Sequence, residues 1–550
     1  MRVSARKSAV VGAAALALAL SACGGDDGGD DGGGEASGGG GGAITIRGCN
    51  PENPLIPGMT NETCGGDVLD QLFSRLVRYD SETAEPHNEI AESIESEDNI
   101  NWTVTVADGW TFHNGEPITA QSFVDAWNWN AYGPNGALNA YFFEPIEGYT
   151  EAQGEYDESG AYIEGSATAE TMSGLEVVDE STFTVKLTEP SSSFPLRLGY
   201  TAFAPLPPSF FEDPEAFGEE PIGSGPFQFE SWERNVEIKL SAYEDYQGEV
   251  KPQIDEATFK IYENDDAAYN ELQADQLDIV PQLPTSAVAG EAYKNDLGDR
   301  FIERETGVIQ TMTFAPENVD PSLANPKLRQ AISLAVDREA IVDSIFSGTR
   351  EPATGWVAPV VEGFEPGACD GYCEYDPDRA KQLLDEAGGY SGTLTISYNG
   401  DADHKGWVDA TCNSIQNALE IECQGKSEVD FATFRTKINN REMPGIFRTG
   451  WQMDYPSVEN FLVPLYATNA SANDGLYSNP EFDKAVAEAA TLQGEEAIAK
   501  YNEAEAMLAA DMPAVPLWYG KTIAGYSTNV DNVKITPFQT VDLLSVTTAG

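Results

Sequence analysis

The first 42 residues limit how much of this 550-residue chain can fold. Basic residues at positions 2, 6 and 7 precede an apolar run over residues 9–20, and Leu-Ser-Ala-Cys follows, ending at Cys23. This order is typical of a secretory signal, and the run is too short to cross a hydrocarbon core of about 30 Å as a helix. Residues 24–42 are mostly Gly and Asp, which cannot bury enough apolar surface to fold. We therefore expect a signal peptide over residues 1–22, a disordered tether over 23–42 and a folded body of about 508 residues.

The end of the predicted signal resembles the bacterial lipobox. That resemblance implies that Cys23 is lipidated and becomes the first residue of the mature chain. A plain secretory signal with an unmodified Cys23 is the alternative. We expect an extracytoplasmic protein, held on the outer face of the cell membrane by a lipid on Cys23.

Charge excludes several classes of partner. Acidic residues outnumber Lys and Arg by 91 to 31, which gives a formal charge of −60. Nucleic-acid binding requires clustered basic residues, so we expect no nucleic-acid partner. The acidity favours solubility outside the cell; the alternative interpretation is an electric field that attracts cationic or zwitterionic solutes.

Six cysteines remain once Cys23 is set aside, an even number in a chain expected to enter an oxidising compartment. Proximity in the sequence favours three disulfides, one of 15 possible connectivities: Cys49–Cys64, Cys369–Cys373 and Cys412–Cys423. A zinc site at Cys369 and Cys373 is the weaker alternative, because no histidine lies at ligand spacing from them. We expect no metal and no cofactor.

Hydrophobic periodicity predicts intermixed strands and helices, and therefore an α/β or α+β body. The predicted strands cover residues 43–47, 102–106, 175–187, 236–241 and 256–262. The predicted helices cover residues 64–76, 119–129, 326–346 and 481–511, the second with Thr119 as N-cap.

Five segments, in order along the chain, resemble the family 5 extracellular solute-binding proteins, the oligopeptide and dipeptide receptors of ABC importers. They are GWTFHNGEPITA with SFVDAW at residues 109–127, PIGSGP at 221–226, NPKLRQAISLAVDR at 325–338, YDPDRAKQLL at 375–384 and GWQMDYP at 450–456. The second segment has Ser224 where the family usually has Thr. The resemblance covers about residues 43–550.

The resemblance implies an α/β, two-lobed fold of the type II periplasmic-binding-protein kind, with an extra subdomain in the N-terminal lobe. The expected limits are residues 43–70, 175–258 and 519–550 for the core of lobe I, 71–174 for the extra subdomain, and 259–518 for lobe II. We expect two crossing strands between the lobes, near residues 256–263 and 513–519. Lobes of this type close on a ligand by a hinge movement.

The resemblance also implies a function. The expected protein is a non-catalytic monomer that captures short peptides and delivers them to the membrane subunits of an ABC importer. Another solute, such as an oligosaccharide or a metal chelate, is the alternative within the fold. A secreted hydrolase is the alternative from another class, but the chain lacks the Gly-x-Ser-x-Gly, His-Glu-x-x-His and phosphate-loop patterns.

Asp454 occupies the position at which peptide-binding members of the family pair with the ligand's α-ammonium. A buried ammonium needs such a carboxylate, because desolvation otherwise cancels the gain from binding. The alternative is that Asp454 caps a turn before Pro456. Trp451 and Tyr455 flank it and could form the walls of a cleft or pack in the core.

Other candidates rest on weaker patterns. Asn399 follows a predicted strand and could bond a peptide backbone, and the aromatic residues Tyr141 and Trp407 could line the cleft. Three arginines could bind a ligand carboxylate, although surface salt bridges are the more common role for such residues: Arg435, Arg441 and Arg448.

Overall fold

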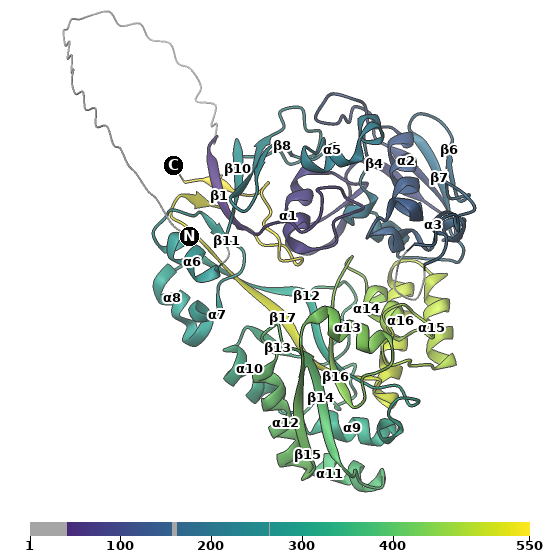
Figure 1. Ribbon diagram of the computed structural model, residues 1–550, viewed down its shortest axis with the longest axis vertical. Helices are drawn as coiled ribbons and strands as arrows, with labels where there is room; N and C mark the ends of the chain where they lie inside the picture. Colours follow the sequence, from purple (N-terminus) through teal and green to yellow (C-terminus); the bar gives the residue numbers. More distant parts are fainter. Residues whose placement is uncertain (1–40, 157–161, 263, 550) are drawn as a thin grey trace, which may run out of the picture. The chain divides into compact units, whose positions relative to one another are not determined.

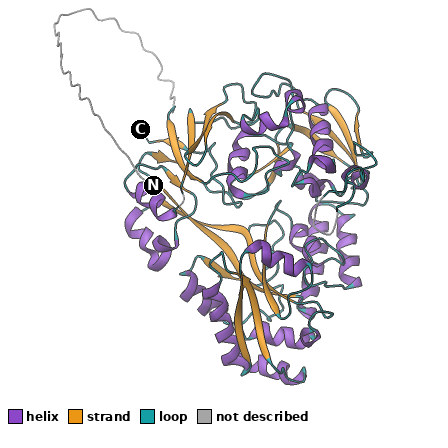
Figure 2. Ribbon diagram, viewed as in Figure 1, coloured by secondary structure: helices purple, strands orange, loops and turns teal. Residues whose placement is uncertain are grey.

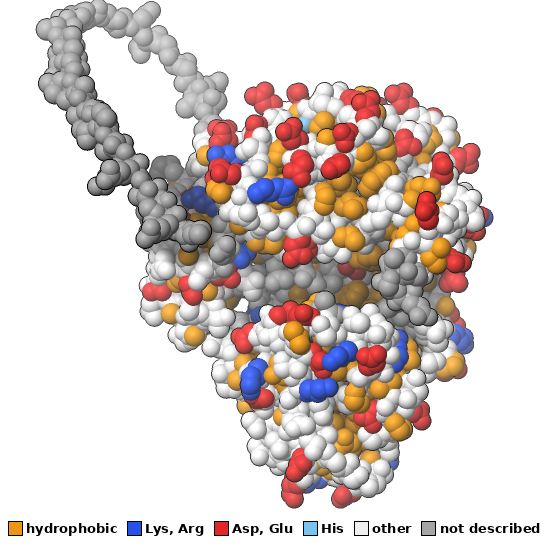
Figure 3. All heavy atoms as spheres, in the orientation of Figure 1, with side chains coloured by type: hydrophobic (Ala, Val, Ile, Leu, Met, Phe, Trp, Pro, Cys, Tyr) orange, Lys and Arg blue, Asp and Glu red, His pale blue; other side chains and the backbone are white. Residues whose placement is uncertain are grey.

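The computed structural model describes residues 41–156, 162–262 and 264–549 (Figure 1). The predicted signal peptide, the lipidation site Cys23 and all but the last two residues of the predicted tether lie outside these residues. In the described part of the chain no helix is both long enough and apolar enough to span a membrane. The acidic side chains are spread over the face shown in Figure 3, which fits the interpretation of the charge as a solubility feature.

An 11-stranded mixed sheet runs through both lobes. Its order is β15 (Glu422–Glu428), β14 (Thr393–Asn399), β16 (Ile446–Gln452), β12 (Phe301–Phe314), β17 (Ala514–Tyr526), β11 (Ile279–Val280), β1 (Ala43–Gly48), β10 (Glu256–Ile261), β9 (Glu237–Ala242) and β8 (Phe227–Glu233), with β13 (Arg350–Pro352) paired to β17. β1 and β10 pair in parallel with Ile44 opposite Ala257, and both residues are buried.

Lobe I is the part of the chain packed around one large core that includes Ile44, Trp127 and Leu240. Its helices are α1 (Thr63–Leu72), α2 (Ala120–Ala131), α3 (Tyr149–Gln153), α4 (Phe194–Arg197) and α5 (Pro214–Glu219). Its smaller strands are β2 (Val77–Tyr79), β3 (Pro86–Asn88), β18 (Val530–Asp531) and β19 (Thr547–Thr548), and a separate sheet has the order β4 (Ala91–Glu95), β5 (Asn101–Val106), β7 (Thr182–Lys186) and β6 (Leu175–Val177). Thr119 is the N-cap of α2, as predicted.

Lobe II is built around a second core that includes Leu394, Trp407 and Phe461. Figure 2 shows helices on either side of its strands. These helices are α9 (Pro326–Leu334), α10 (Arg338–Phe346), α11 (Pro377–Glu386), α12 (Lys405–Leu419), α13 (Phe431–Asn439), α14 (Val458–Tyr466), α15 (Pro480–Ala490) and α16 (Gly494–Asp511). A third, small core holds α6 (Asp265–Gln273), α7 (Thr285–Val288) and α8 (Ala292–Leu297) against Ile523 of β17. The two-lobed α/β fold is therefore confirmed, while the exact limits of the lobes stay a prediction.

The strands that join the lobes differ in part from the prediction. β10 pairs with β1 and β9 and remains in lobe I, so the predicted first crossing near residues 256–263 is wrong. Instead, the 14-residue β12 pairs with the 13-residue β17 along most of its length, from Phe301 opposite Gly525 to Thr313 opposite Ala514. Strands of this length reach about 45 Å, enough to belong to both lobes.

Two predicted helices are each broken into two. The pattern over residues 326–346 forms α9 and α10, because Asp337 leaves the helix and its side chain accepts a hydrogen bond from the Ala340 amide. The pattern over residues 481–511 forms α15 and α16, separated at residues 491–493. In both cases the apolar spacing continues across the break, so periodicity alone does not reveal it.

The six cysteines lie in the three predicted pairs. The Cα–Cα separations are 5.2 Å for Cys49–Cys64, 5.7 Å for Cys369–Cys373 and 5.0 Å for Cys412–Cys423, all within the range of a disulfide. Within the described residues no group of three or more His, Cys, Asp or Glu side chains is arranged to hold a metal ion.

Candidate ligand-binding cleft

A cavity of about 290 Å³ lies between the lobes and contains Asp454. Lobe II contributes the segment Gln452, Met453 and Asp454, which follows the end of β16. Lobe I contributes α1, the loop before it and several aromatic residues. The cavity therefore exists only where the two lobes meet, as expected for a site that responds to a hinge movement.

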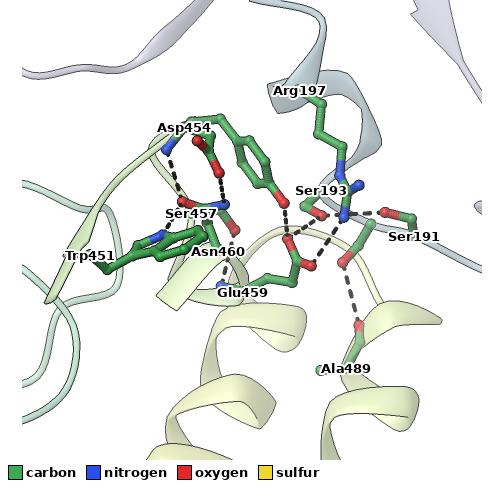
Figure 4. Close-up of polar contacts among 11 residues, drawn as sticks. Ser191, Ser193, Arg197, Trp451, Asp454, Ser457, Glu459, Asn460 and Ala489 are labelled. Carbon is green, nitrogen blue, oxygen red and sulfur yellow. Dashed lines mark hydrogen bonds and ion pairs between the residues drawn. The ribbon is translucent and has the colours of Figure 1, made fainter. Parts of the chain in front are cut away.

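Asn460 of α14 holds Asp454 in place (Figure 4). Its side-chain oxygen accepts hydrogen bonds from the Asp454 amide and from Trp451 Nε1, both at 3.0 Å, and its Nδ2 donates to Asp454 Oδ2 at 3.1 Å. Asn460 is 1% exposed, so this amide group is rigidly packed. The cap of α14 is Ser457, whose side chain accepts from the Glu459 amide, so Asp454 is not the cap of this helix.

Burial is the main reason that the pKa of Asp454 is raised to about 6; the hydrogen bond from Asn460 and the charge of Arg197 oppose the shift. Three tyrosines of lobe I, Tyr79, Tyr141 and Tyr200, line the same cavity. Burial raises the pKa of Tyr79 and of Tyr200, and the charge of Asp454 raises both further. The carboxylate of lobe II and the tyrosines of lobe I therefore line one cavity from its two sides.

The lobe I wall of the cavity is acidic as well. Glu62, Asp67 and Asp70 line it. Arg75 Nη1 pairs with Asp70 Oδ1 at 2.8 Å, whereas no hydrogen bond to the Asp67 side chain is found among the described residues. Burial and the neighbouring Asp70 raise the pKa of Asp67 to about 8. Four carboxyl groups therefore line this cavity. Among the described residues that line it, the one cationic side chain is Arg75, which is already paired with Asp70.

The structure places the predicted aromatic residues in different environments. Tyr141 lines the cavity and is 52% exposed. Tyr455 is buried, and its hydroxyl donates to Glu459 at 2.7 Å. Trp407 is buried in the core of lobe II against Trp518, with ring centroids 5.2 Å apart, and is not brought to the cavity.

A second cavity, of about 310 Å³, lies within lobe II and includes Trp451 and Arg448. Arg448 Nε donates to Asn399 Oδ1 at 2.8 Å, and the guanidinium lies 5.1 Å from the ring centroid of Phe431. Burial, then the neighbouring Arg435, lowers the pKa of Arg448 to about 10. No carboxylate of the described residues pairs with Arg448.

The side chains of the two other candidate arginines already have partners within the protein. Arg435 forms an ion pair with Asp474 at 2.6 Å, and Arg441 Nη1 donates to the carbonyl oxygens of Ile438 and Asp474. Asn399 is 3% exposed and donates to Asp401 at 2.6 Å, so it supports Arg448 rather than facing the cavity between the lobes. Of the three arginines predicted as carboxylate anchors, Arg435 is paired with a carboxylate. Arg448 is the one that both lines a cavity and has no carboxylate partner within the described chain.

Sequence reasoning missed several residues of the cleft. Asp67, Tyr79, Tyr200 and Asn460 carry no motif, and the first three come from segments of lobe I far from Asp454 in the sequence. The spacing of Asp67 and Asp70, which places both on one face of α1, is a signal that could have suggested a shared role.

Two lobes joined by crossing strands around a polar cavity are the arrangement of a solute-binding receptor. A model of the bacterial extracellular solute-binding proteins, family 5 (middle) matches residues 85–473. The chain belongs to this family, whose members are solute-binding receptors and not enzymes, so the prediction of a non-catalytic protein is confirmed.

Relatives in the family cover nearly the whole chain. The oligopeptide-binding protein OppA of Bacillus subtilis is 26% identical over 524 residues, covering 91% of this chain and 92% of its own. The glutathione-binding protein GsiB of Salmonella typhimurium is 26% identical over 510 residues, covering 88% and 90%. The fold is similar to that of the unliganded open form of the periplasmic murein tripeptide-binding protein MppA, with a TM-score of 0.78, 22% identity, and coverage of 92% of this chain and 97% of that one.

Proposed function

We propose that this protein captures short peptides between its lobes and delivers them to the membrane subunits of an ABC importer. The observation that carries the proposal is Asp454, a carboxylate held by Asn460 in a cavity between the lobes. A partly buried carboxylate without a protein cation bonded to it is a suitable partner for the α-ammonium of a peptide. The names of relatives support peptides as the ligand class, since OppA is an oligopeptide-binding protein and MppA a murein tripeptide-binding protein.

Arg448 is the proposed anchor for the peptide's carboxylate. Its planar guanidinium suits a carboxylate, and its partial burial makes an anionic partner favourable. Arg448 belongs to β16 and Asp454 lies six positions further along the chain. At about 3.3 Å per extended residue the two backbone positions are at most about 20 Å apart, a separation that an extended peptide of about six residues covers.

The proposal extends to the parts of the chain outside the described residues. We propose that a lipid on Cys23 holds the receptor on the outer face of the cell membrane, with residues 24–42 as a flexible tether. The receptor is proposed to act as a monomer. We further propose that the three cysteine pairs are oxidised in the exported protein.

Titration calorimetry with matched ligands tests the peptide assignment. The ligands are di- to pentapeptides with both ends free, the same peptides N-acetylated, glutathione and a neutral oligosaccharide. We expect saturable binding of the free peptides and weaker binding of the acetylated ones, because acetylation removes the ammonium. Binding of the oligosaccharide alone, or indifference to acetylation, would refute the assignment.

A further inference from the structure

One buried ion pair joins the two lobes beside the cleft (Figure 4). Arg197, at the end of α4 in lobe I, places Nη2 3.1 Å from Oε1 of Glu459, the second residue of α14 in lobe II. Their side chains are 17% and 5% exposed. The guanidinium of Arg197 also lies 5.2 Å from the ring centroid of Tyr455 in lobe II.

Glu459 is saturated with donors from both lobes. Its Oε2 accepts from Ser193 Oγ of lobe I at 2.9 Å and from the Tyr455 hydroxyl of lobe II at 2.7 Å. Buried charges are tolerated when several hydrogen bonds accompany the ion pair, and removal of one partner leaves the other charge buried and unpaired. Separation of the lobes would remove Ser193 and Arg197 from Glu459 but would leave Tyr455 in place.

A row of amide hydrogen bonds lies across the same junction. Asn99 of lobe I is 1% exposed, and its Nδ2 donates to the carbonyl oxygens of Ala490 at 3.1 Å and Leu492 at 2.9 Å, between α15 and α16. Gln493 Nε2 donates back to Asn99 Oδ1 at 3.0 Å. Figure 1 places α15 and α16 on the right of lobe II, whereas β12 and β17 cross between the lobes further to the left. The junction is therefore separate from the strands that form the hinge.

The junction and the ligand site share one short segment of chain. Asn460, which positions Asp454, directly follows Glu459, and Tyr455, which bonds Glu459, directly follows Asp454. A movement of lobe I away from Glu459 would therefore disturb the same loop that presents the ligand carboxylate.

We propose that Arg197 and Glu459 form an interlobe latch, which sets the population of the closed conformation and thereby the apparent affinity for every ligand of the cleft. Only the effect on ligand affinity rests on the proposed function. The effect on lobe closure does not, because the ion pair is present in the chain without ligand. For a ligand that requires closed lobes, the apparent dissociation constant equals the intrinsic dissociation constant divided by the closed fraction. The latch residues act as positioning residues, because neither Arg197 nor Glu459 lines the cavity that contains Asp454.

Small-angle X-ray scattering of the ligand-free protein tests the latch directly. Glu459→Gln removes the charge but keeps the shape, and we expect a larger radius of gyration than for the unmodified protein. The matched control is Glu386→Gln, which breaks an exposed pair with Lys327 inside lobe II and should leave the scattering unchanged. An unchanged radius of gyration for Glu459→Gln would overturn the proposal, whatever the protein binds.

Calorimetry of the singly and doubly substituted proteins tests the consequence for binding. We expect Glu459→Gln and Arg197→Gln each to raise the dissociation constant by about tenfold or more, equally for free and N-acetylated peptides. In the double variant, the increase in the dissociation constant should be smaller than the product of the two single increases. If the increase for the double variant equals the product of the two single increases, Arg197 and Glu459 are not coupled and the latch is refuted. A loss confined to free-amine peptides would assign Glu459 to ligand recognition instead and would equally refute the latch.

Circular dichroism and thermal melting establish that each variant is folded. If Glu459→Gln does not fold, Ser193→Ala removes one lobe I donor without burying a charge, and a smaller increase in the radius of gyration is expected. An absence of peptide binding in every protein, with the scattering difference intact, would refute the peptide assignment and leave the latch supported.

Discussion

The substitution Asp454→Asn tests the central residue of the cleft. The amide has nearly the same shape as the carboxylate and can still accept the hydrogen bond that Asn460 Nδ2 donates at 3.1 Å. What it loses is the negative charge that would face the ligand's ammonium. A hydrogen bond to a charged group contributes about 1.5–3 kcal/mol, which corresponds to a roughly tenfold to hundredfold change in affinity.

The lower part of this range is the expected one. Burial raises the pKa of Asp67 to about 8, so that carboxyl is largely protonated near neutral pH and replaces little of the lost charge. Glu62 and Asp70 line the same cavity and would still attract the ammonium after Asp454 is neutralised. We therefore expect a loss on the order of tenfold.

Titration calorimetry against one tetrapeptide in free and N-acetylated form provides the assay. The free peptide should bind Asp454→Asn about tenfold more weakly, whereas the acetylated peptide should bind both proteins equally. The control Asp385→Asn removes an exposed charge from α11 in lobe II and should have no effect. An unchanged affinity of Asp454→Asn for the free peptide would remove Asp454 from the site.

The pH dependence gives a second measure of the same interaction. Because the pKa of Asp454 is raised to about 6, its ionised form is lost as the pH falls through that value. The affinity of the unmodified protein for the free peptide should therefore fall between about pH 7 and pH 5. Asp454→Asn should show a smaller fall; equal pH profiles would refute the assignment.

Three further predictions concern other sites. Arg448→Gln should weaken the binding of peptides with a free carboxylate by about tenfold in calorimetry and leave the affinity for C-amidated peptides unchanged. An equal loss of affinity for both would contradict its role as an anion anchor. Asp67→Asn should raise the melting temperature at about pH 8 but not near pH 3.5. Folding raises the pKa of this carboxyl from 3.8 to about 8, so the unmodified protein loses stability as the pH rises between these values. Calorimetric melting that shows no pH-dependent gain for the variant would refute this. Cys23→Ser should move the protein from the membrane fraction to the medium, and membrane retention in an immunoblot would argue against the lipid anchor.

The sequence predicted local elements well where their neighbours in the chain decide them. Alternation predicts β5, and the Thr119 cap predicts the start of α2. It failed at residues 335–337 and 491–493, where the apolar pattern continues but the chain leaves the helix. It also failed for the first crossing strand, because pairing of β10 with β1 is a contact between residues about 200 positions apart that periodicity does not encode.

Within the cleft, the family resemblance pointed to Asp454 and the chemistry of arginine pointed to three candidates for the carboxylate anchor. The structure separated those three, since an ion pair with Asp474 or carbonyl contacts occupy Arg435 and Arg441. It also moved Trp407 into the core, where burial against Trp518 accounts for its aromatic side chain. Such distinctions depend on which groups surround a side chain, and the sequence does not contain that information.

By itself, the sequence determined the acidic charge and pointed to the family, and it predicted the pairing of neighbouring cysteines. These properties follow from composition, short spacing and ordered motifs. Only the tertiary structure decided that α1 of lobe I brings Asp67 and Asp70 to the cavity of Asp454, and that Arg197 reaches Glu459 across the lobes. The physical reason is that desolvation and ion pairing act through space, so the pKa values and the partners of these groups emerge only when distant segments of the chain are packed together.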